Sequence, residues 1–239
     1  MKIKPLKHYI VFENDDFIAI NKPSGIASLH DRFGSTISVQ QLAEKYCKTA
    51  QLCHRLDKET SGILLIAKNP ETYRAIAMSF ENRTVQKVYH AVSEGRHYFQ
   101  QLRVDLPLAV TSRGRAKIDK HRGKPANTHF SVLETFRHFS LIECRPVTGR
   151  LHQIRIHLGS QNAPIAHDSI YGGNLPYLRD IKKSYNLGRD KEERPMIGRT
   201  ALHAYSLKFE LNGETHTLAA DYPKDLNVFV TLLRKYDAD

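Results

Sequence analysis

The sequence of 239 residues has no tryptophan, only three cysteines and no long apolar run. The cysteines, Cys47, Cys53 and Cys144, are odd in number and none lies in a CxxC pair, which excludes a disulfide scaffold and is typical of reduced thiols. No segment approaches the roughly 18 apolar residues of a membrane-spanning helix. Glu13 closes the one apolar cluster near the N-terminus, so we expect no secretion signal. We therefore expect a cytoplasmic protein with no membrane partner.

Several common catalytic motifs are also missing. The sequence contains no Walker loop, no GxGxxG after a strand, no GxSxG and no HExxH, which argues against nucleotide hydrolysis, dinucleotide redox chemistry, elbow-type esterases and zincin proteases. His152 and His157 are five residues apart, whereas paired metal ligands on one helix stand four apart. Cys47, Cys53 and His54 lack a second ligand pair at zinc-finger spacing. We expect no metal site.

Acidic residues are scarce relative to basic ones. There are 36 lysines and arginines against 25 aspartates and glutamates, so the net charge is +11. A field of this sign attracts polyanions, and nucleic acid is the first candidate. Residues 112–125 are the densest basic run, and their glycines and terminal proline exclude a long helix. We expect a flexible loop that follows a phosphate backbone, with a merely solvated loop as the alternative. Its cations are Arg113, Arg115, Lys117, Lys120, Arg122 and Lys124, against one acid, Asp119.

Apolar periodicity and turn residues predict short strands mixed with helices. Ser38 and Asn69 are the expected N-caps of two of the helices. No regular strand–helix repeat occurs, so the predicted fold class is α+β. The predicted strands are a hairpin over 9–20 and strands at 52–56, 63–67, 85–92, 128–135, 139–146 and 207–211; the predicted helices are 38–48, 69–82, 151–160 and 226–235.

The segment HRLDKETSG, residues 54–62, places an acid among cations beside an apolar strand. Asp57 lies between Arg55 and Lys58 and precedes residues 63–67, ILLIA, which are apolar on both faces of the predicted strand. The neighbouring cations would keep a partly buried Asp57 ionised, and an ionised carboxylate is a competent nucleophile. The alternative is that Asp57 only caps the polar turn.

A second polar segment, TGRLHQIRIHL at residues 148–158, predicts a helix with a cation on its buried side. Leu151, Ile154 and Leu158 form the apolar stripe, and Arg155 lies on the same side as Leu151. A cation in that position can pair with a buried carboxylate.

The string HRLDKETSGILLIAKN, residues 54–69, resembles the catalytic motif of the RluA family of RNA pseudouridine synthases, with Asp57 at the position of the nucleophile. Further segments are similar to the family's other motifs in the same order, so the resemblance extends from residue 9 to about residue 223. These segments are FIAINKPSG at 17–25, KVYHAV at 87–92, TGRLHQIRIHL at 148–158 with Pro164, Ile165 and 168–172, and ALHA at 201–204 with Leu207 and Phe209.

The resemblance implies a single catalytic domain over residues 1–239, with a mixed, mostly antiparallel sheet flanked by helices and loops. It implies isomerisation of uridine to pseudouridine in ribosomal or transfer RNA, at a base flipped out of its stack. Asp57 would attack the nucleoside, either at the ribose or at the uracil ring. Tyr89 would stack on the uracil and assist proton movement, and Arg155 would pair with Asp57. Arg55 would fill the gap left by the flipped base, and no cofactor is implied.

RNA contacts are expected from the basic loop and from cations near the motifs. Relatives often carry an N-terminal S4 RNA-binding domain, and only eight residues precede Tyr9, so we expect the catalytic domain to bind RNA by itself, as a monomer. The expected RNA-binding residues are His54, Arg55, Arg113, Arg115, Lys117, Lys120, Arg122, Lys124 and Arg150.

Two features depart from the family pattern. His167 stands before Asp168 where the family has glycine, and the charged insert at 177–199 has no assigned role.

Two other functions stay open at this point. One is an RNA-binding or ribosome-assembly protein without catalysis, which would bind RNA and change no uridine. The other is a metal-dependent phosphoesterase, which a chelator would inactivate.

Overall fold

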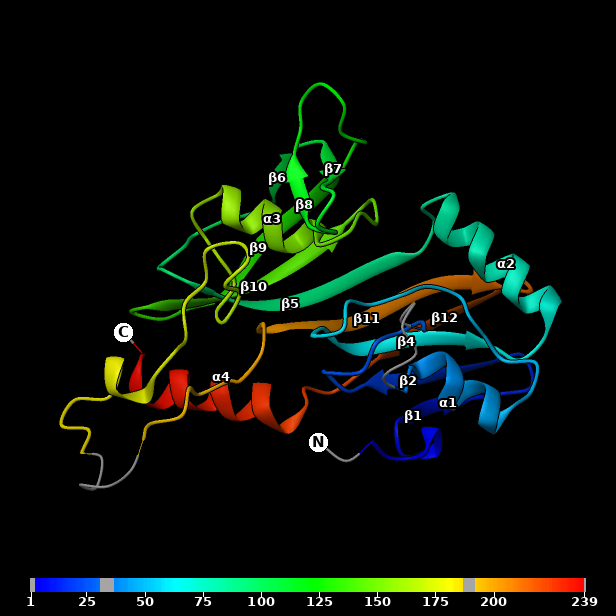
Figure 1. Cartoon of the computed structure of the whole chain (residues 1–239), viewed down its shortest axis with the longest axis horizontal. Coiled ribbons are helices and arrows are strands. Elements are labelled where there is room, and N and C mark those ends of the chain that lie inside the picture. The colour runs from blue at the N-terminus through cyan, green and yellow to red at the C-terminus, as the bar shows by residue number, and fades with distance from the viewer. Residues whose placement is uncertain (1–2, 31–36, 187–191, 239) are drawn as a thin grey trace. The chain divides into compact units, whose positions relative to one another are not determined.

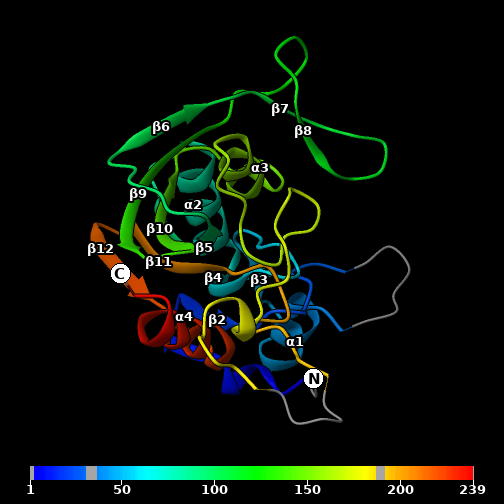
Figure 2. The ribbon, with the colours of Figure 1, turned by 90° about the vertical axis from the view of Figure 1, so that its left-hand side faces the viewer.

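The computed structural model describes residues 3–30, 37–186 and 192–238. The chain, coloured by residue number in Figure 1 and Figure 2, divides into two compact units. Unit 1 comprises Met1–Val88 and His203–Asp221, and unit 2 comprises Tyr89–Leu202 and Tyr222–Asp239. That residues 1–239 act as one catalytic domain stays a prediction.

Unit 1 is built on a sheet with the strand order β1, β2, β4, β11. Strand β4 runs parallel to β11, whereas the other pairings in this sheet are antiparallel. The mixed, mostly antiparallel sheet and its flanking helices confirm the predicted α+β class. The strands are β1 (Ile10–Glu13), β2 (Phe17–Lys22), β4 (Ser61–Ala67) and β11 (Leu202–Leu211), with β3 (Gln51–Leu52) on β4 and β12 (Glu214–Ala219) on β11.

Strand β4 is the centre of unit 1. All seven of its residues are buried, which confirms the strand predicted at 63–67 as buried on both faces. It pairs with β2, whose apolar residues 17–20 are also buried. The β1–β2 turn forms because Asn14 Oδ1 accepts the backbone N–H groups of Asp16, at 3.0 Å, and Phe17, at 2.8 Å. The predicted hairpin over 9–20 is therefore confirmed.

The helices of unit 1 begin where their capping residues predict. Ser38 and Gln41 form a reciprocal capping box at the start of α1 (Val39–Tyr46). Asn69 Oδ1 accepts the N–H of Thr72 at 2.8 Å at the start of α2 (Pro70–Glu81). Both helices end within two residues of the predicted ends. The short 3-10 helix η1 (Leu6–His8) precedes the sheet.

The strand predicted at 52–56 is wrong over most of its length, because β3 ends at Leu52. Beyond it, the N–H of Cys53 still donates to the C=O of Leu65 at 3.0 Å, but the pairing does not continue as a strand. His54 Nε2 accepts the N–H of Leu65 at 3.1 Å, so a side chain takes the place of a strand partner for β4. The backbone of Leu56 bonds to Ser28 instead of to the sheet. Residues 53–60 are therefore a loop held by side chains.

Unit 2 has an antiparallel sheet with the strand order β5, β10, β9, β6. Helices α3 (Gln153–Ser160) and α4 (Lys224–Tyr236) pack on it through a core that includes Ile142, Leu158 and Phe229 (Figure 1). The strands predicted at 85–92, 128–135 and 139–146 and the helix predicted at 226–235 are present. The strands are β5 (Gln86–Glu94), β6 (Leu102–Asp105), β9 (Asn127–Thr135) and β10 (Phe139–Pro146).

Helix α3 differs from its prediction in two ways. It begins at Gln153 and not at Leu151, because His152 has a left-handed backbone, with φ of +52°. Residues 153–158 are all buried, so the helix is covered on every side instead of along one stripe. His157 is also buried, and its Nδ1 lies 2.9 Å from Thr128 Oγ1.

The basic segment 112–125 is not simply a flexible loop. Strands β7 (Leu108–Val110) and β8 (Ala116–Ile118) pair as a hairpin that projects from β9 in Figure 2. A second turn follows, in which Asp119 Oδ1 accepts the N–H groups of His121 and Arg122. We call residues 108–124 the basic hairpin.

The charged insert, residues 177–199, lies partly outside the described residues, which omit 187–191. Its described part contains the 3-10 helix η2 (Leu178–Asp180), and Ile181 and Ile197 are buried in the core of unit 2. Arg199 Nε donates to Asp225 Oδ2 at 2.7 Å and so ties the end of the insert to α4.

Candidate active site

The loop that carries Asp57 is fixed on both sides of this residue. Ser28 Oγ donates to the C=O of Leu56 at 2.7 Å and accepts its N–H at 3.0 Å. On the other side, the C=O of Lys58 accepts from the N–H of Gly25 at 2.8 Å. The C=O of Asp57 itself accepts the N–H of Thr60 at 3.1 Å, as the turn interpretation predicts. Asp57 is half-buried on a main chain that has little freedom to move.

Lys22 also supports the Asp57 loop, and the sequence did not predict this role. Its side chain is fully buried, and its Nζ donates to three carbonyl groups, those of Pro23 at 3.0 Å, Ile26 at 2.9 Å and Lys58 at 3.2 Å. A buried ammonium group needs such acceptors, because its desolvation is costly. The lysine thus joins the turn after β2 to the Asp57 loop. The available signal was a lysine two residues after the apolar run 17–20 and directly before the turn Pro23-Ser24-Gly25.

The start of β4 is packed closely against β11. Ser61 Oγ lies 2.9 Å from Nδ1 of the buried His203, whose Nε2 lies 2.9 Å from the C=O of Ala220. Gly62 has φ of +117°, and a Cβ atom there would stand 2.1 Å from the carbonyl oxygen of Ala204. Only glycine fits, so the end of the motif is fixed in position by backbone contact.

His54 and Arg55, both predicted to bind RNA, differ in their surroundings. Arg55 is exposed. The His54 ring stacks on Phe80 with a centroid distance of 4.5 Å. Burial, together with the charge of Lys87, lowers the pKa of His54 to about 3. Burial also lowers the pKa of Lys87 to about 8, with a further contribution from Arg83.

Tyr89 is the first residue of unit 2 and is half-buried in β5, opposite Cys144 of β10. Its neighbour His90 is buried, and its Nδ1 lies 2.5 Å from the hydroxyl of Tyr222. Burial lowers the pKa of His90 to about 4 against an opposing effect of Glu143. His90 is therefore a neutral imidazole, on the face of the strand opposite to Tyr89.

Arg155 is buried in α3 and binds a carboxylate, as its place on the buried side predicts. Its Nε donates to Asp168 Oδ2 and its Nη2 to Asp168 Oδ1, both at 2.7 Å. Asp168 is 1 % exposed, so this is a buried, two-point ion pair, the strongest geometry for arginine and a carboxylate. The ring of Tyr171 lies beside the same guanidinium, 5.1 Å from its carbon to the ring centroid. Pairing of Arg155 with Asp57 joins residues of the two units and stays a prediction.

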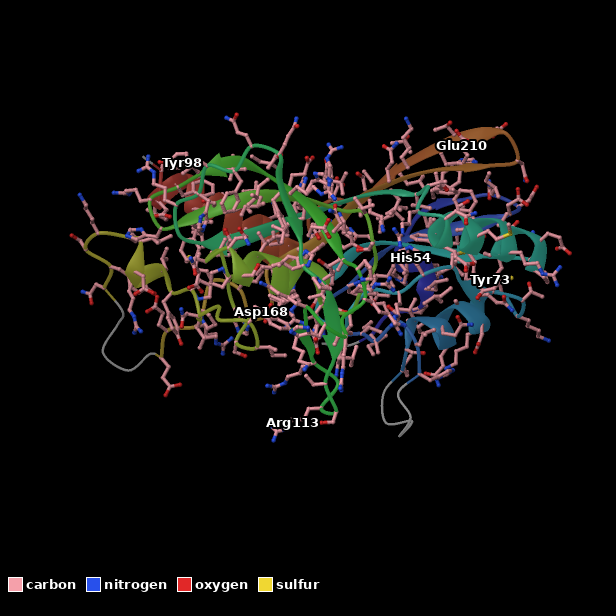
Figure 3. The ribbon with its side chains drawn as sticks, turned by 90° about the horizontal axis from the view of Figure 1, so that it is seen from above. His54, Tyr73, Tyr98, Arg113, Asp168 and Glu210 are labelled. Carbon is pink, nitrogen blue, oxygen red and sulfur yellow. The ribbon has the colours of Figure 1, made fainter. Side chains whose placement is uncertain are left out.

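The predicted RNA-binding cations of unit 2 gather on the basic hairpin. Figure 3 shows Arg113 at its tip. Lys117 Nζ lies 3.1 Å from Asp119 Oδ2. Hydrogen bonds from the backbone of Arg122 and His121 and from Lys117 lower the pKa of Asp119 to about 2. Arg150 Nε donates to the C=O of Pro125 at 3.2 Å, at the end of the basic segment.

Two further observations concern metals and membranes. Among the residues that the structure describes, no group of three histidine, cysteine or carboxylate side chains is placed to hold a metal ion. None of the helices in the described ranges combines the length and the apolar character needed to cross a bilayer.

Comparison with known proteins identifies the family. The family model of RNA pseudouridylate synthase matches residues 16–160, which include Asp57, Tyr89 and Arg155. The chain belongs to the RNA pseudouridylate synthase family. This confirms the family that the motifs predicted.

Two similar curated proteins are bacterial. Ribosomal large subunit pseudouridine synthase D of Neisseria meningitidis serogroup B is 34% identical over 241 residues, covering 97% of this chain and 62% of the relative. Ribosomal large subunit pseudouridine synthase C of Haemophilus influenzae is 35% identical over 243 residues, covering 98% of this chain and 71% of the relative. The chain thus spans less than two thirds of the length of the Neisseria protein.

A solved structure shows the same fold. Human RNA Pseudouridylate Synthase Domain Containing 4 matches with a TM-score of 0.72 and 24% sequence identity, covering 96% of this chain and 94% of that chain. The α+β fold is therefore that of the RNA pseudouridylate synthases.

Proposed function

We propose that the chain isomerises uridine to pseudouridine in ribosomal RNA, with Asp57 as the nucleophile. The observation that carries the proposal is Asp57 itself, at the nucleophile position of the family motif and on a loop held at Leu56 and Lys58. A positioned nucleophile lowers the barrier because little orientation remains to be gained at reaction. Ribosomal RNA is favoured over transfer RNA because the names of both bacterial relatives specify the large ribosomal subunit.

The reaction is an isomerisation and balances without a cofactor. Asp57 forms a bond to the nucleoside, the N1–C1′ bond breaks, the uracil turns, a C5–C1′ bond forms, and the bond to Asp57 breaks, which restores its carboxylate. C5 loses its proton and N1 gains one, so the product has the atoms of the substrate. Tyr89 stacks on the uracil and assists the proton transfer, and Arg155 keeps the nucleophile ionised.

The RNA is bound mainly through its backbone by the basic hairpin, Arg150 and the exposed Arg55. Arg55 enters the stack that the flipped uridine leaves, which offsets part of the unstacking cost of a few kcal/mol. A phosphate contact by His54 has less support, because its lowered pKa leaves the ring neutral near pH 7. The protein acts as a monomer in the cytoplasm.

The test replaces the nucleophile. Asp57→Asn should abolish pseudouridine formation on ribosomal RNA while RNA affinity stays within a few-fold, because a nucleophile contributes to chemistry and not to docking. Mass spectrometry of the RNA measures the product and filter binding measures the Kd. Asp15→Asn, the same change at an exposed turn of unit 1, is the matched control and should stay active. Activity of Asp57→Asn above a tenth of wild type would contradict the assignment.

A further inference from the structure

The side chain of Tyr171 connects Arg155 to the basic hairpin. The ring of Tyr171 lies beside the Arg155 guanidinium, 5.1 Å from centroid to carbon. The hydroxyl of the same residue accepts the N–H of Ala116 at 3.0 Å and donates to its C=O at 3.2 Å. Ala116 belongs to β8, between Arg115 and Lys117. One residue therefore contacts a proposed catalytic cation with its ring and the proposed RNA-binding strand with its hydroxyl.

Packing around this connection is dense. Ala116, Leu108, Ala126 and Ile156 form a small apolar cluster, against which Tyr171 packs. Ile156 directly follows Arg155 in α3, so the helix residue that packs against the hairpin lies in the same helix turn as the arginine. A Cβ atom at Gly159 would lie 2.9 Å from the carbonyl oxygen of Tyr171, which shows how closely the Tyr171 segment lies against α3.

Further polar contacts fix the orientation of both groups. Asp168 holds Nε and Nη2 of Arg155. His152, which precedes α3 in the left-handed conformation, has Nδ1 2.9 Å from the Tyr171 hydroxyl. A guanidinium held by a carboxylate and a ring has a defined plane, so a shift of the ring changes where its donors point.

We propose that Tyr171 is a positioning residue that makes the orientation of Arg155 depend on RNA bound at the basic hairpin. Phosphates bound by Arg115 and Lys117 fix the position of the Ala116 backbone between them. The Tyr171 hydroxyl is hydrogen-bonded to Ala116, so the position of the Tyr171 ring beside Arg155 follows that of Ala116. The inference rests on the proposed function, since it gives a role to RNA on the hairpin. Its consequence is that RNA which occupies the hairpin is turned over faster than RNA which does not.

The kinetic test combines two changes. Tyr171→Phe keeps the ring beside Arg155 and removes the hydrogen bonds to Ala116. Single-turnover rates at saturating RNA should fall about tenfold, the effect of one or two lost hydrogen bonds, with the Kd within about twofold. In the double variant Arg115→Ala, Lys117→Ala, the same substitution should lower the single-turnover rate by no more than about twofold, because no phosphate is then bound at these two positions of the strand.

Tyr98→Phe is the matched control for the kinetic test. Tyr98 also has an arginine over its ring, Arg96, and a hydroxyl bonded to that arginine, but it is 66% exposed and remote from Arg155 in sequence. It should keep the wild-type rate. If Tyr171→Phe slows the reaction equally in both backgrounds, the hydroxyl only supports the local structure and the proposal is overturned.

A second readout does not depend on catalysis. In protein with 15N-labelled arginine, the Nε–H resonance of Arg155, assigned by its loss in Arg155→Lys, should shift when a ribosomal RNA stem-loop binds. The shift should disappear in Tyr171→Phe with RNA still bound. If wild-type protein forms no pseudouridine but shows this dependence, the proposed function falls and the connection stands. A shift that persists in Tyr171→Phe overturns the connection alone.

Discussion

His54 shows how a single side chain sets the path of the loop around Asp57. Its Nε2 accepts the N–H of Leu65 at the centre of β4, and its ring stacks on Phe80. A ring nitrogen can accept a hydrogen bond only when it carries no proton. The pKa of about 3, caused by burial and by Lys87, agrees with this requirement. The geometry thus favours a structural imidazole at a position that was predicted to contact RNA.

This state of His54 predicts how stability depends on pH. The unfolded ring titrates near 6.5 and the folded ring near 3, so the unfolded state binds the extra proton between these values. The contribution of His54 is complete above pH 6.5 and is lost as the pH falls towards 3. From pH 7 to pH 5 the loss is at most about 2 kcal/mol in the free energy of unfolding. Urea unfolding at the two pH values should show a smaller loss for His54→Gln than for wild type.

The comparison isolates His54 from other groups that titrate in this range. His90 is buried with a pKa lowered to about 4, so it adds to the pH dependence of both proteins equally. Glutamine has an amide oxygen that can replace the acceptor for Leu65 and does not titrate. Identical losses in the two proteins would show that His54 is not neutral in the folded state.

At the scale of the elements, local signals predicted the helices well and the short strands poorly. Ser38 and Asn69 fix helix starts through bonds to residues three positions away, which can be read from the sequence alone. Strands β6, β7 and β12 were missed, because short strands with exposed polar positions depend on partners that only the tertiary fold supplies. Strand β8 was taken as loop for the same reason, since its pairing with β7 outweighs its charge.

In the candidate site, too, some features could be predicted from the sequence and others could not. Asp57 could be proposed as the nucleophile because its motif is continuous in the sequence. A buried carboxylate partner for Arg155 could be expected from the helix pattern, but its identity, Asp168, could not, because Asp168 lies in a loop with no periodicity. The support from Lys22 and Ser28 was also hidden, since their hydrogen bonds to the Asp57 loop span 36 and 28 residues of the chain.

The loop that carries Asp168 contains the departure at His167. His167 has φ of +62°, a left-handed conformation that glycine adopts without steric cost and other residues at about 1–2 kcal/mol. The turn is formed nevertheless, with the N–H of His167 donating to the C=O of Asn174 at 2.8 Å and Asp168 buried. Histidine therefore replaces the usual glycine at the expense of backbone strain, without loss of the Asp168–Arg155 pair.

Substitution at this position should reveal the strain. His167→Gly should raise the free energy of unfolding by up to about 1 kcal/mol, because released strain is partly offset by the greater freedom of glycine in the unfolded chain. His167→Val should lower it by about 1–2 kcal/mol, since β-branched residues tolerate a positive φ least. Urea unfolding of the three proteins measures the order. A valine variant as stable as wild type would mean that the backbone does not keep this conformation.

At the scale of the whole molecule, the excess of positive charge is concentrated where an element projects into solvent. The net charge is +11, and residues 112–125 carry six cations against one acid. Figure 2 shows the hairpin extending from the body of unit 2, and its cationic positions are exposed. Charge on a projecting element can follow a phosphate backbone without desolvating a packed surface. Under the proposed function, the rest of the protein would distinguish the target uridine while the hairpin supplies affinity.

Neutralising the hairpin should therefore weaken binding to many RNAs by a similar factor, since phosphate contacts carry no sequence information. The slope of log Kd against log salt should become shallower by about 0.7–0.9 for each phosphate contact removed. Lys117 should contribute less than Arg115, because Asp119, whose pKa is about 2, stays ionised and already pairs with it. Kd values for Arg115→Ala, Lys117→Ala and the variant lacking all six cations, measured from low to high salt, test this order. An unchanged slope in the last variant would show that RNA is bound elsewhere on the surface.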